Sequence, residues 1–408
     1  MAEERLSTTR RRPQARVLRN DDRVLDASEA ILSDTGWGGF NVATIARKSK
    51  LSHPAVKDRF PSKHEGAELL WKHRVAERVT QNMASLLELV GTSTGPISRE
   101  AVETAFQPWV QPGTTMRAAA ELLVLANHDA PLQEAVATSL GALVGSMCKP
   151  SKRLSPEVAA QRGYLANLAL GFLLIARRKG IAKFDFGREW ESLADALNNP
   201  GKPQDVPKLP GLRTIDKLNF DTGHPEHDAL LRATLELVAE QGYHDVRIDD
   251  IGDAIGVTKG FIFARYDRKQ ALFIDATRRQ RGMSIAANLK SMADIARSHG
   301  NSIAEVALMQ DVQKPRFSRI RALDLEQLML LWHDKGLRDA EEERLAAAEA
   351  DYAQRRPDTS EAEVKAHVHV ARALGVGIGL LPFLLPTAHR LAYEIVTQPL
   401  HDRDSSMN

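Results

Sequence analysis

Two lysines, Lys63 and Lys269, stand where they could hold a phosphate group. Each follows an aromatic residue by three positions, Phe60 in one case and Tyr266 in the other, and each opens a stretch that reads as a helix. At the start of a helix, a cationic side chain and the unpaired backbone N–H groups together attract an anion. The two lysines therefore point to an anion such as a phosphate group as a ligand, and the alternative is a pair of solvated surface lysines.

The residues around the two lysines form a repeat. Residues 50–63 align with residues 256–269 without a gap, at a constant offset of 206 residues. The facing pairs are Leu51 and Val257, Ser52 and Thr258, Val56 and Ile262, Arg59 and Arg265, and further upstream Gly36 and Gly242. A weaker similarity links residues 169–171 with residues 373–375. The chain is therefore expected to contain two copies of one module of about 200 residues.

Each copy is predicted to begin with a helix, a short helix, a tight turn and another short helix. Apolar residues recur with a helical period before Gly36 and Gly242, and glycine suits the left-handed position that ends a helix. After the turn, Ser52 and Thr258 stand where an N-cap is expected. This order is that of a helix-turn-helix, whose second helix enters the DNA major groove.

The pattern resembles the TetR family of bacterial transcription regulators. The resemblance depends on the glycine-aromatic pairs, the Ile45 and Ile251 core positions, the Ser or Thr that starts the second helix, and the lysines Lys63 and Lys269. It implies an all-α fold of two TetR-like modules, each with a DNA-binding domain followed by a helical ligand-binding and dimerisation domain. Two such units in one chain are similar to a layout used by some actinobacterial regulators.

The resemblance and the helix geometry together predict which residues bind double-stranded DNA. Lys63 and Lys269 correspond to the lysine that contacts phosphate in the family. The residues expected at the DNA interface are Arg10, Arg11, Arg12, Ser52, His53, Ala55, Lys57, Lys63, Thr258, Lys259, Phe261, Phe263 and Lys269. Lysines can donate to guanine, and Ala55 can touch a thymine methyl group. For the basic arm, a solvated tail is the alternative.

The two copies differ where they would read DNA. The tyrosine usual in the family is Lys57 in the first copy and Phe263 in the second, and the turn residue is Lys50 in one and Gly256 in the other. Residues 1–75 hold 15 Lys or Arg against 10 Asp or Glu, whereas residues 224–281 hold nine against ten. We therefore expect an operator with two unlike half-sites.

Composition and the positions of prolines and glycines indicate the predicted domain boundaries. The chain is only 5% aromatic, which favours helices over sheets. It has one cysteine, which excludes a disulfide within the chain. The predicted parts are a basic arm (1–19), a first helix-turn-helix domain (20–68), a first regulatory domain (69–197), a proline-rich linker (198–225), a second helix-turn-helix domain (226–274), a second regulatory domain (275–400) and a polar tail (401–408). The linker is expected to be semi-extended and to leave the arrangement of the modules open.

The regulatory domains are expected to bind an apolar small-molecule effector. Candidate ligand-binding residues are Trp109, His128, Trp332 and His333, for which core packing is the alternative. The stretches around residues 165–177 and 368–383 are expected to pair within one chain, although a homodimer would bury them equally well. The apolar run at residues 373–388 is too short to span a bilayer and is predicted to be buried.

Other functions are less well supported by the sequence. His367 with His369, and His224 with His227, lack a third metal ligand at a telling spacing. We therefore predict no enzymatic activity, no cofactor and no metal, and a cytoplasmic protein without membrane association. The alternative function is a carrier of lipids or acyl compounds that binds DNA weakly.

Overall fold

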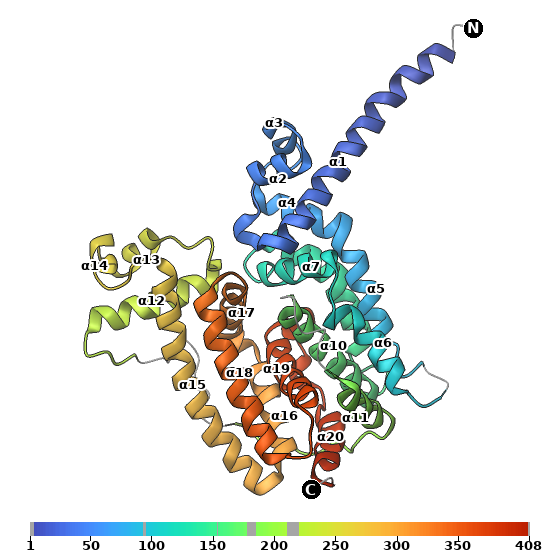
Figure 1. The fold of residues 1–408 in the computed structure, drawn as a ribbon, viewed down its shortest axis with the longest axis vertical. Coiled ribbons are helices and arrows are strands. Elements are labelled where there is room, and N and C mark those ends of the chain that lie inside the picture. The colour runs from blue at the N-terminus through green and yellow to red at the C-terminus, as the bar shows by residue number, and fades with distance from the viewer. Residues whose placement is uncertain (1–3, 93–94, 153, 178–184, 210–219, 407–408) are drawn as a thin grey trace.

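The computed structural model describes residues 4–92, 95–152, 154–177, 185–209 and 220–406 (Figure 1). For residues 4–18, 284–288, 333 and 402–406 it describes the backbone alone. The described residues fold into helices and form no strand, apart from an isolated bridge between Ser151 and Leu154. The predicted all-α fold is confirmed.

The N-terminal half begins with a long helix and three short ones. They are α1 (Glu4–Gly39), α2 (Val42–Ser49), α3 (His53–Lys57) and α4 (Lys63–Leu70). A π-helical stretch, Trp71–Val75, leads into α5 (Ala76–Leu87), and the remaining helices are α6 (Arg99–Val110), α7 (Thr114–Leu125), α8 (Ala130–Val136), the π-helical Ala137–Gly141, α9 (Ala142–Cys148), α10 (Pro156–Ala176) and α11 (Gly187–Asn198).

The C-terminal half follows a similar order with longer helices. They are α12 (Pro225–Gln241), α13 (Ile248–Ile255), α14 (Lys259–Phe263), α15 (Lys269–His299), α16 (Asn301–Val312), α17 (Ser318–His333), α18 (Lys335–Arg355), α19 (Glu361–Leu384) and α20 (Glu394–Ser406). Single 3₁₀ turns occur at Pro315–Phe317 and Ala388–Arg390.

The first helix is longer than its apolar period predicts. The sequence predicts a basic arm up to residue 19, whereas α1 already starts at Glu4 and projects from the molecule (Figure 1). Near its other end α1 bends at Gly36, where φ is 69°, and α12 ends at Gly242, where φ is 81°. Both glycines adopt the positive φ that the sequence predicts and that residues with a Cβ atom avoid.

Helices α10 and α19 pack along each other and join the two halves of the chain (Figure 1). Their backbones approach closely at two glycines. A Cβ atom on Gly171 would lie 1.7 Å from the carbonyl oxygen of Ala373, and one on Gly377 would lie 1.9 Å from that of Asn167. The Asn167 side chain also donates to the carbonyl of Leu374 at 3.0 Å. Glycine is therefore required on both helices for this contact.

Both of these helices are long and apolar enough to cross a membrane by composition alone. In α10, 94% of the apolar window is buried inside the protein, and in α19 the share is 56%. The sequence predicts that the run at residues 373–388 is too short to span a bilayer, whereas the helix α19 that contains it is long enough by this measure. Its predicted burial is confirmed only in part, because Ala373, Leu380 and Leu381 are fully buried but Gly375 is exposed. These helices therefore serve as core helices in this fold.

The linker packs against the end of the chain. The Gly201 N–H donates to the carbonyl of Ile395 at 2.8 Å, and the Gln204 N–H donates to Glu394 at 3.3 Å, both in α20. Leu209 is buried in a small apolar cluster with Ile295 and Ile303. This part of the predicted linker therefore lies against the C-terminal half, while its role in the arrangement of the modules stays a prediction.

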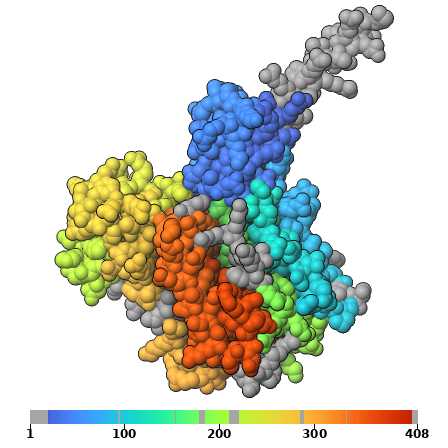
Figure 2. Space-filling model, in the orientation of Figure 1, coloured from blue at the N-terminus to red at the C-terminus, as the bar shows by residue number. Residues whose placement is uncertain are grey.

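The two segments with short helices project from this body (Figure 2). The first helix-turn-helix segment, residues 20–68, forms the blue projection, which includes the second half of α1. The second helix-turn-helix segment, residues 226–274, forms the yellow projection at the side. Both segments therefore present their short helices to the outside of the molecule.

Candidate nucleic-acid interface

The first segment holds a short capped helix on a buried anchor. Between α2 and α3 the chain turns at residues 50–52, and the Ser52 side chain accepts a hydrogen bond from the Ala55 N–H at 3.4 Å. Val56 is fully buried and ties α3 to the core, while the Arg59 guanidinium donates to the Ala55 carbonyl at 2.7 Å. The cap and the arginine satisfy both ends of a five-residue helix, which leaves its outer face exposed.

The second segment repeats this construction. The Thr258 side chain accepts from the Phe261 N–H at 3.4 Å, and Ile262 is fully buried. The Arg265 guanidinium donates to the Phe261 carbonyl at 3.0 Å. The predicted caps at Ser52 and Thr258 are confirmed, and α14, like α3, has five residues.

The outward residues of the two short helices differ in chemistry. On α3, His53 and Lys57 are exposed and Ala55 is half-buried. On α14, Lys259 is exposed but forms an ion pair with Asp249 at 2.8 Å. Phe263 is 49% exposed, which is high for a large apolar side chain. Phe261 is half-buried, with the Arg265 guanidinium 3.8 Å from its ring centre. One outer face is thus basic and the other is apolar.

Lys63 and Lys269 open α4 and α15, and both ammonium groups are turned towards their own segment. Lys63 Nζ lies 3.8 Å from the ring centre of Trp37, and Lys269 Nζ lies 4.3 Å from that of Tyr243. Lys269 also donates to the carbonyls of Tyr243 and Val246, each at 2.6 Å. Burial lowers the pKa of both lysines, and Asp245 partly opposes this effect in each case. Lys269 therefore stabilises the turn between α12 and α13, and Lys63 packs on the matching residue at the end of α1.

The turn between the two short helices uses a left-handed residue in both segments. Lys50 has φ 55° and ψ 40°, and Gly256 has φ 71° and ψ 29°. Lys50 is the one residue other than glycine with a positive φ in the part of the chain that the structure describes. These two positions are equivalent in the repeat. Glycine adopts this backbone conformation without strain at position 256, whereas Lys50 adopts it at a conformational cost.

Residues 230–276 match the family described as bacterial regulatory proteins, tetR family. Because of this similarity, residues 230–276 are called the TetR-type domain. It begins within α12, ends within α15 and includes the whole capped unit of α13 and α14. No curated protein matches the chain.

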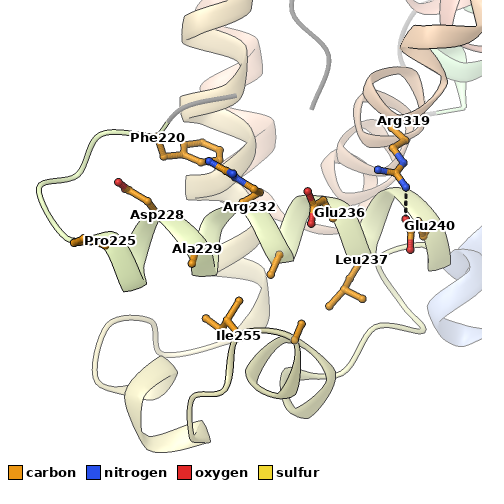
Figure 3. A pocket seen from close by; sticks show the side chains of 12 residues that line it. Phe220, Pro225, Asp228, Ala229, Arg232, Glu236, Leu237, Glu240, Ile255 and Arg319 are labelled. Atoms are coloured by element: carbon orange, nitrogen blue, oxygen red, sulfur yellow. Dashed lines mark hydrogen bonds and ion pairs between the residues drawn. The ribbon is translucent and has the colours of Figure 1, made fainter. Parts of the chain in front are cut away.

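The TetR-type domain has an open groove at a position where the first segment has an arginine side chain. Arg23 of α1 donates to the carbonyls of Ser49 and Lys50 and so closes the end of α2. The equivalent residue of α12 is Ala229, and a groove of about 680 Å³ runs beside it between α12 and α13 (Figure 3). Arg232 and Ile255 line this groove.

Each segment is held to the body by a buried glutamate. The Trp37 N–H donates to Glu121 of α7 at 2.9 Å, and the Tyr243 N–H donates to Glu326 of α17 at 2.9 Å. Both side chains are almost completely buried. Sequence reasoning missed this pair, although each glutamate stands seven residues before the His-Asp pairs at 128–129 and 333–334.

The two glutamates have different neighbours. Glu121 forms a buried ion pair with Arg177, which also donates to the carbonyl of Leu32 at 2.6 Å. Glu326 instead lies 3.1 Å from Nε2 of His128, a residue of the N-terminal half. One segment is therefore held by a permanent cation and the other by a histidine from across the molecule.

The segments also touch each other near these glutamates. His64 Nε2 lies 3.7 Å from Asp245, and a Cβ atom on Gly38 would lie 3.1 Å from the ring of His244. Burial lowers the pKa of His244, with Glu326 and Glu121 opposing that shift. The turn of each segment thus contacts the turn of the other.

The structure places the candidate ligand-binding residues in different surroundings. Trp109 is fully buried in the main core, and His128 lines a void of about 10 Å³ beside Glu326. Trp332 lines a cavity of about 50 Å³, and the Arg177 guanidinium lies 4.3 Å from its ring centre. The side chain of His333, like those of Arg10, Arg11 and Arg12, lies outside the described residues.

His367 and His369, which were considered as metal ligands, have other partners. His367 stacks on Tyr352 with ring centres 4.0 Å apart and lies 3.1 Å from Glu189. His369 bonds the carbonyl of Lys365 at 2.8 Å. Within the described residues, no group of three or more His, Cys, Asp or Glu side chains could hold a metal ion.

Proposed function

We propose that this protein is a DNA-binding transcriptional regulator with two non-identical reading heads in one chain, acting as a ligand-responsive repressor. One observation carries the proposal. The TetR-type domain contains a capped five-residue helix on a buried anchor, and an equivalent helix lies 206 residues earlier. A helix that is capped, anchored and exposed on one face is suited to the major groove.

In this proposal the first head makes the polar contacts. His53 and Lys57 face outwards on α3, so they can reach base edges or phosphates, and Ala55 can touch a thymine methyl group. The Lys63 and Lys269 ammonium groups can each serve a phosphate and the turn together. An ammonium has three N–H donors, and the two carbonyls near Lys269 use two of them. Arg10, Arg11 and Arg12, whose side chains lie outside the described residues, would add contacts to phosphates.

The second head would read DNA through apolar contacts. Phe263 and Phe261 occupy the places of Lys57 and Ala55, and thymine presents a methyl group in the major groove. Lys259 would exchange its ion pair with Asp249 for a contact to DNA. Heads of different chemistry prefer different bases, so the proposed operator has two unlike half-sites.

The two modules would act as a pseudo-dimer within one chain. The close pairing of α10 with α19 and the contacts between the two turns support this arrangement. Residues 165–177 and 368–383 lie mainly in these two helices, which supports the proposed pairing within one chain. A cytoplasmic location follows from the proposed role, because the operator lies on the chromosome.

Retardation of DNA in a gel tests the proposal. The full chain is mixed with DNA from upstream of its own gene at two salt concentrations. We expect specific retardation that weakens steeply at the higher salt, because released counterions drive phosphate contacts. Absence of retardation on this and on neighbouring promoters would favour the carrier function instead.

A further inference from the structure

The C-terminal half contains a cavity of about 650 Å³ between α15, α17, α18 and α19. Its volume lies within the range of small-molecule sites, roughly 300–1,000 Å³. Leu325, Leu328, Leu345 and Val376 contribute apolar surface to its walls. A cavity with this lining accepts a hydrocarbon chain.

Charged side chains line the same cavity unequally. Five arginines, Arg281, Arg321, Arg344, Arg355 and Arg372, face three carboxylates, Asp324, Glu341 and Asp351. The lining therefore carries a formal excess of two positive charges. The sequence suggests a purely apolar ligand. The excess of cations next to an apolar wall indicates instead a ligand that also carries a negative charge.

One of the two excess positive charges lies at a single carboxylate, Glu341. Arg344 and Arg372 both bind Glu341, each at 2.8 Å. The side chains of Arg372 and Glu341 are 15% and 14% exposed, so water screens this group poorly. Burial lowers the pKa of the Arg372 guanidinium, and repulsion from Arg344 and Arg281 adds to the effect. One carboxylate is thus shared by two guanidinium groups.

A further buried arginine also has carbonyl partners. Arg321 is 8% exposed and donates to the carbonyls of Val312 and Lys314, at 2.7 and 2.8 Å. Burial alone lowers the pKa of its guanidinium to about 10. A ligand anion in the cavity would therefore be favoured by Arg321 as well as by the shared pair.

We propose that this cavity binds an amphiphile with one carboxylate, whose headgroup pairs with Arg372 and Arg344 and whose chain lies against the leucines of α17. This inference rests on the proposed function, since it names the effector class of the regulator. A bidentate arginine–carboxylate pair gives both the affinity and the orientation of the headgroup.

The position of the cavity explains how binding of such a ligand would affect both heads. Helix α17 lines the cavity with Leu325 and Leu328 and carries Glu326, which holds Tyr243. The same helix ends near Trp332, whose small cavity shares Arg372 with the large one. Trp332 stacks on Arg177, the partner of Glu121 in the other half.

Isothermal titration calorimetry of the full chain with dodecanoate tests the inference without DNA. We expect dodecanoate to bind and 1-dodecanol to bind more weakly by about tenfold or more, as loss of a charge-assisted pair implies. Equal binding of the acid and the alcohol would overturn the proposal, as would no binding of dodecanoate.

Three variants locate the headgroup. Arg372→Gln should weaken dodecanoate binding by about tenfold and leave 1-dodecanol unchanged. Glu341→Gln should strengthen dodecanoate binding, because it removes the competing carboxylate, and it keeps the test decisive if Arg372→Gln does not fold. Arg297→Gln, at a 77% exposed side chain outside the cavity, should change nothing. Weaker binding by Glu341→Gln would contradict the assignment.

The two proposals can fail separately. Specific DNA retardation without dodecanoate binding overturns the ligand class and leaves the regulator standing. Dodecanoate binding that depends on Arg372, without DNA retardation, keeps the ligand class and overturns the regulator.

Discussion

Glu326 accepts a hydrogen bond from the Tyr243 backbone N–H at 2.9 Å, as Glu121 does from Trp37. This contact joins the first turn after the opening helix of each segment to the body of the protein. It gives the two segments the same mechanical attachment, while their neighbours differ. A change in the position of α7 or α17 therefore acts on the connection between the first two helices of a segment.

We predict that the two glutamates contribute unequally to stability. Glu121→Ala leaves Arg177 as a buried charge without its carboxylate, which costs about 3–5 kcal/mol. Glu326→Ala removes hydrogen-bond partners next to a histidine and should cost about 1–3 kcal/mol. Urea denaturation followed by circular dichroism measures both. A larger loss for Glu326→Ala would contradict this interpretation of the two attachments.

Lys50→Gly should stabilise the protein by about 1 kcal/mol, because it relieves a left-handed backbone. The matched change Gly256→Ala should destabilise it by a similar amount. No atom lies within 4 Å of a Cβ atom at Gly256, so conformation alone sets the cost. The midpoints of urea unfolding compare the two variants. If Lys50→Gly lowered the midpoint, the left-handed geometry at this turn would be wrong.

The glycines between α10 and α19 give a third prediction. Gly377→Ala places a Cβ atom 1.9 Å from the Asn167 carbonyl oxygen and should destabilise the fold by more than about 2 kcal/mol. Gly375→Ala, on the same helix with nothing within 4 Å, should stabilise it by about 0.5–1 kcal/mol. Thermal unfolding separates the two. Similar melting temperatures for both variants would rule out the close approach of these helices.

Stability should also depend on pH through His369. Burial lowers the pKa of this side chain below its ordinary value of 6.5, and the Lys365 carbonyl and Glu341 only partly oppose that shift. The unfolded state then binds the proton more readily, so stability is complete above pH 6.5 and falls as the pH falls through the folded value. Urea denaturation at several pH values should show His369→Gln with a shallower acid loss, by up to about 1.4 kcal/mol per pH unit. An unchanged slope would exclude this histidine as a contributor.

Local chemistry made part of this structure predictable from the sequence. The caps at Ser52 and Thr258 and the positive φ of Gly36 and Gly242 depend on residues a few positions apart, so pattern and residue type suffice. Because the offset between the two copies is constant, each prediction for one segment also applies to the equivalent residue of the other.

Contacts over long sequence distances were beyond such reasoning. The inward turn of Lys269 depends on where the carbonyls of Tyr243 and Val246 come to lie. The packing of the linker depends on α20, almost 200 residues further along the chain. The glutamate pair was visible in the repeat, but its role requires knowing that α7 and α17 pass behind the turns.

DNase I footprinting on the operator tests the central claim most directly. We expect one chain to protect two half-sites of unlike sequence. Phe263→Ala should weaken protection of one half-site, because Phe263 is the 49% exposed apolar side chain on α14. Leu289→Ala, at the other highly exposed large apolar side chain, should leave both half-sites protected. A clean palindrome, protected equally by the wild-type chain and by Phe263→Ala, would contradict the account of two non-identical reading heads.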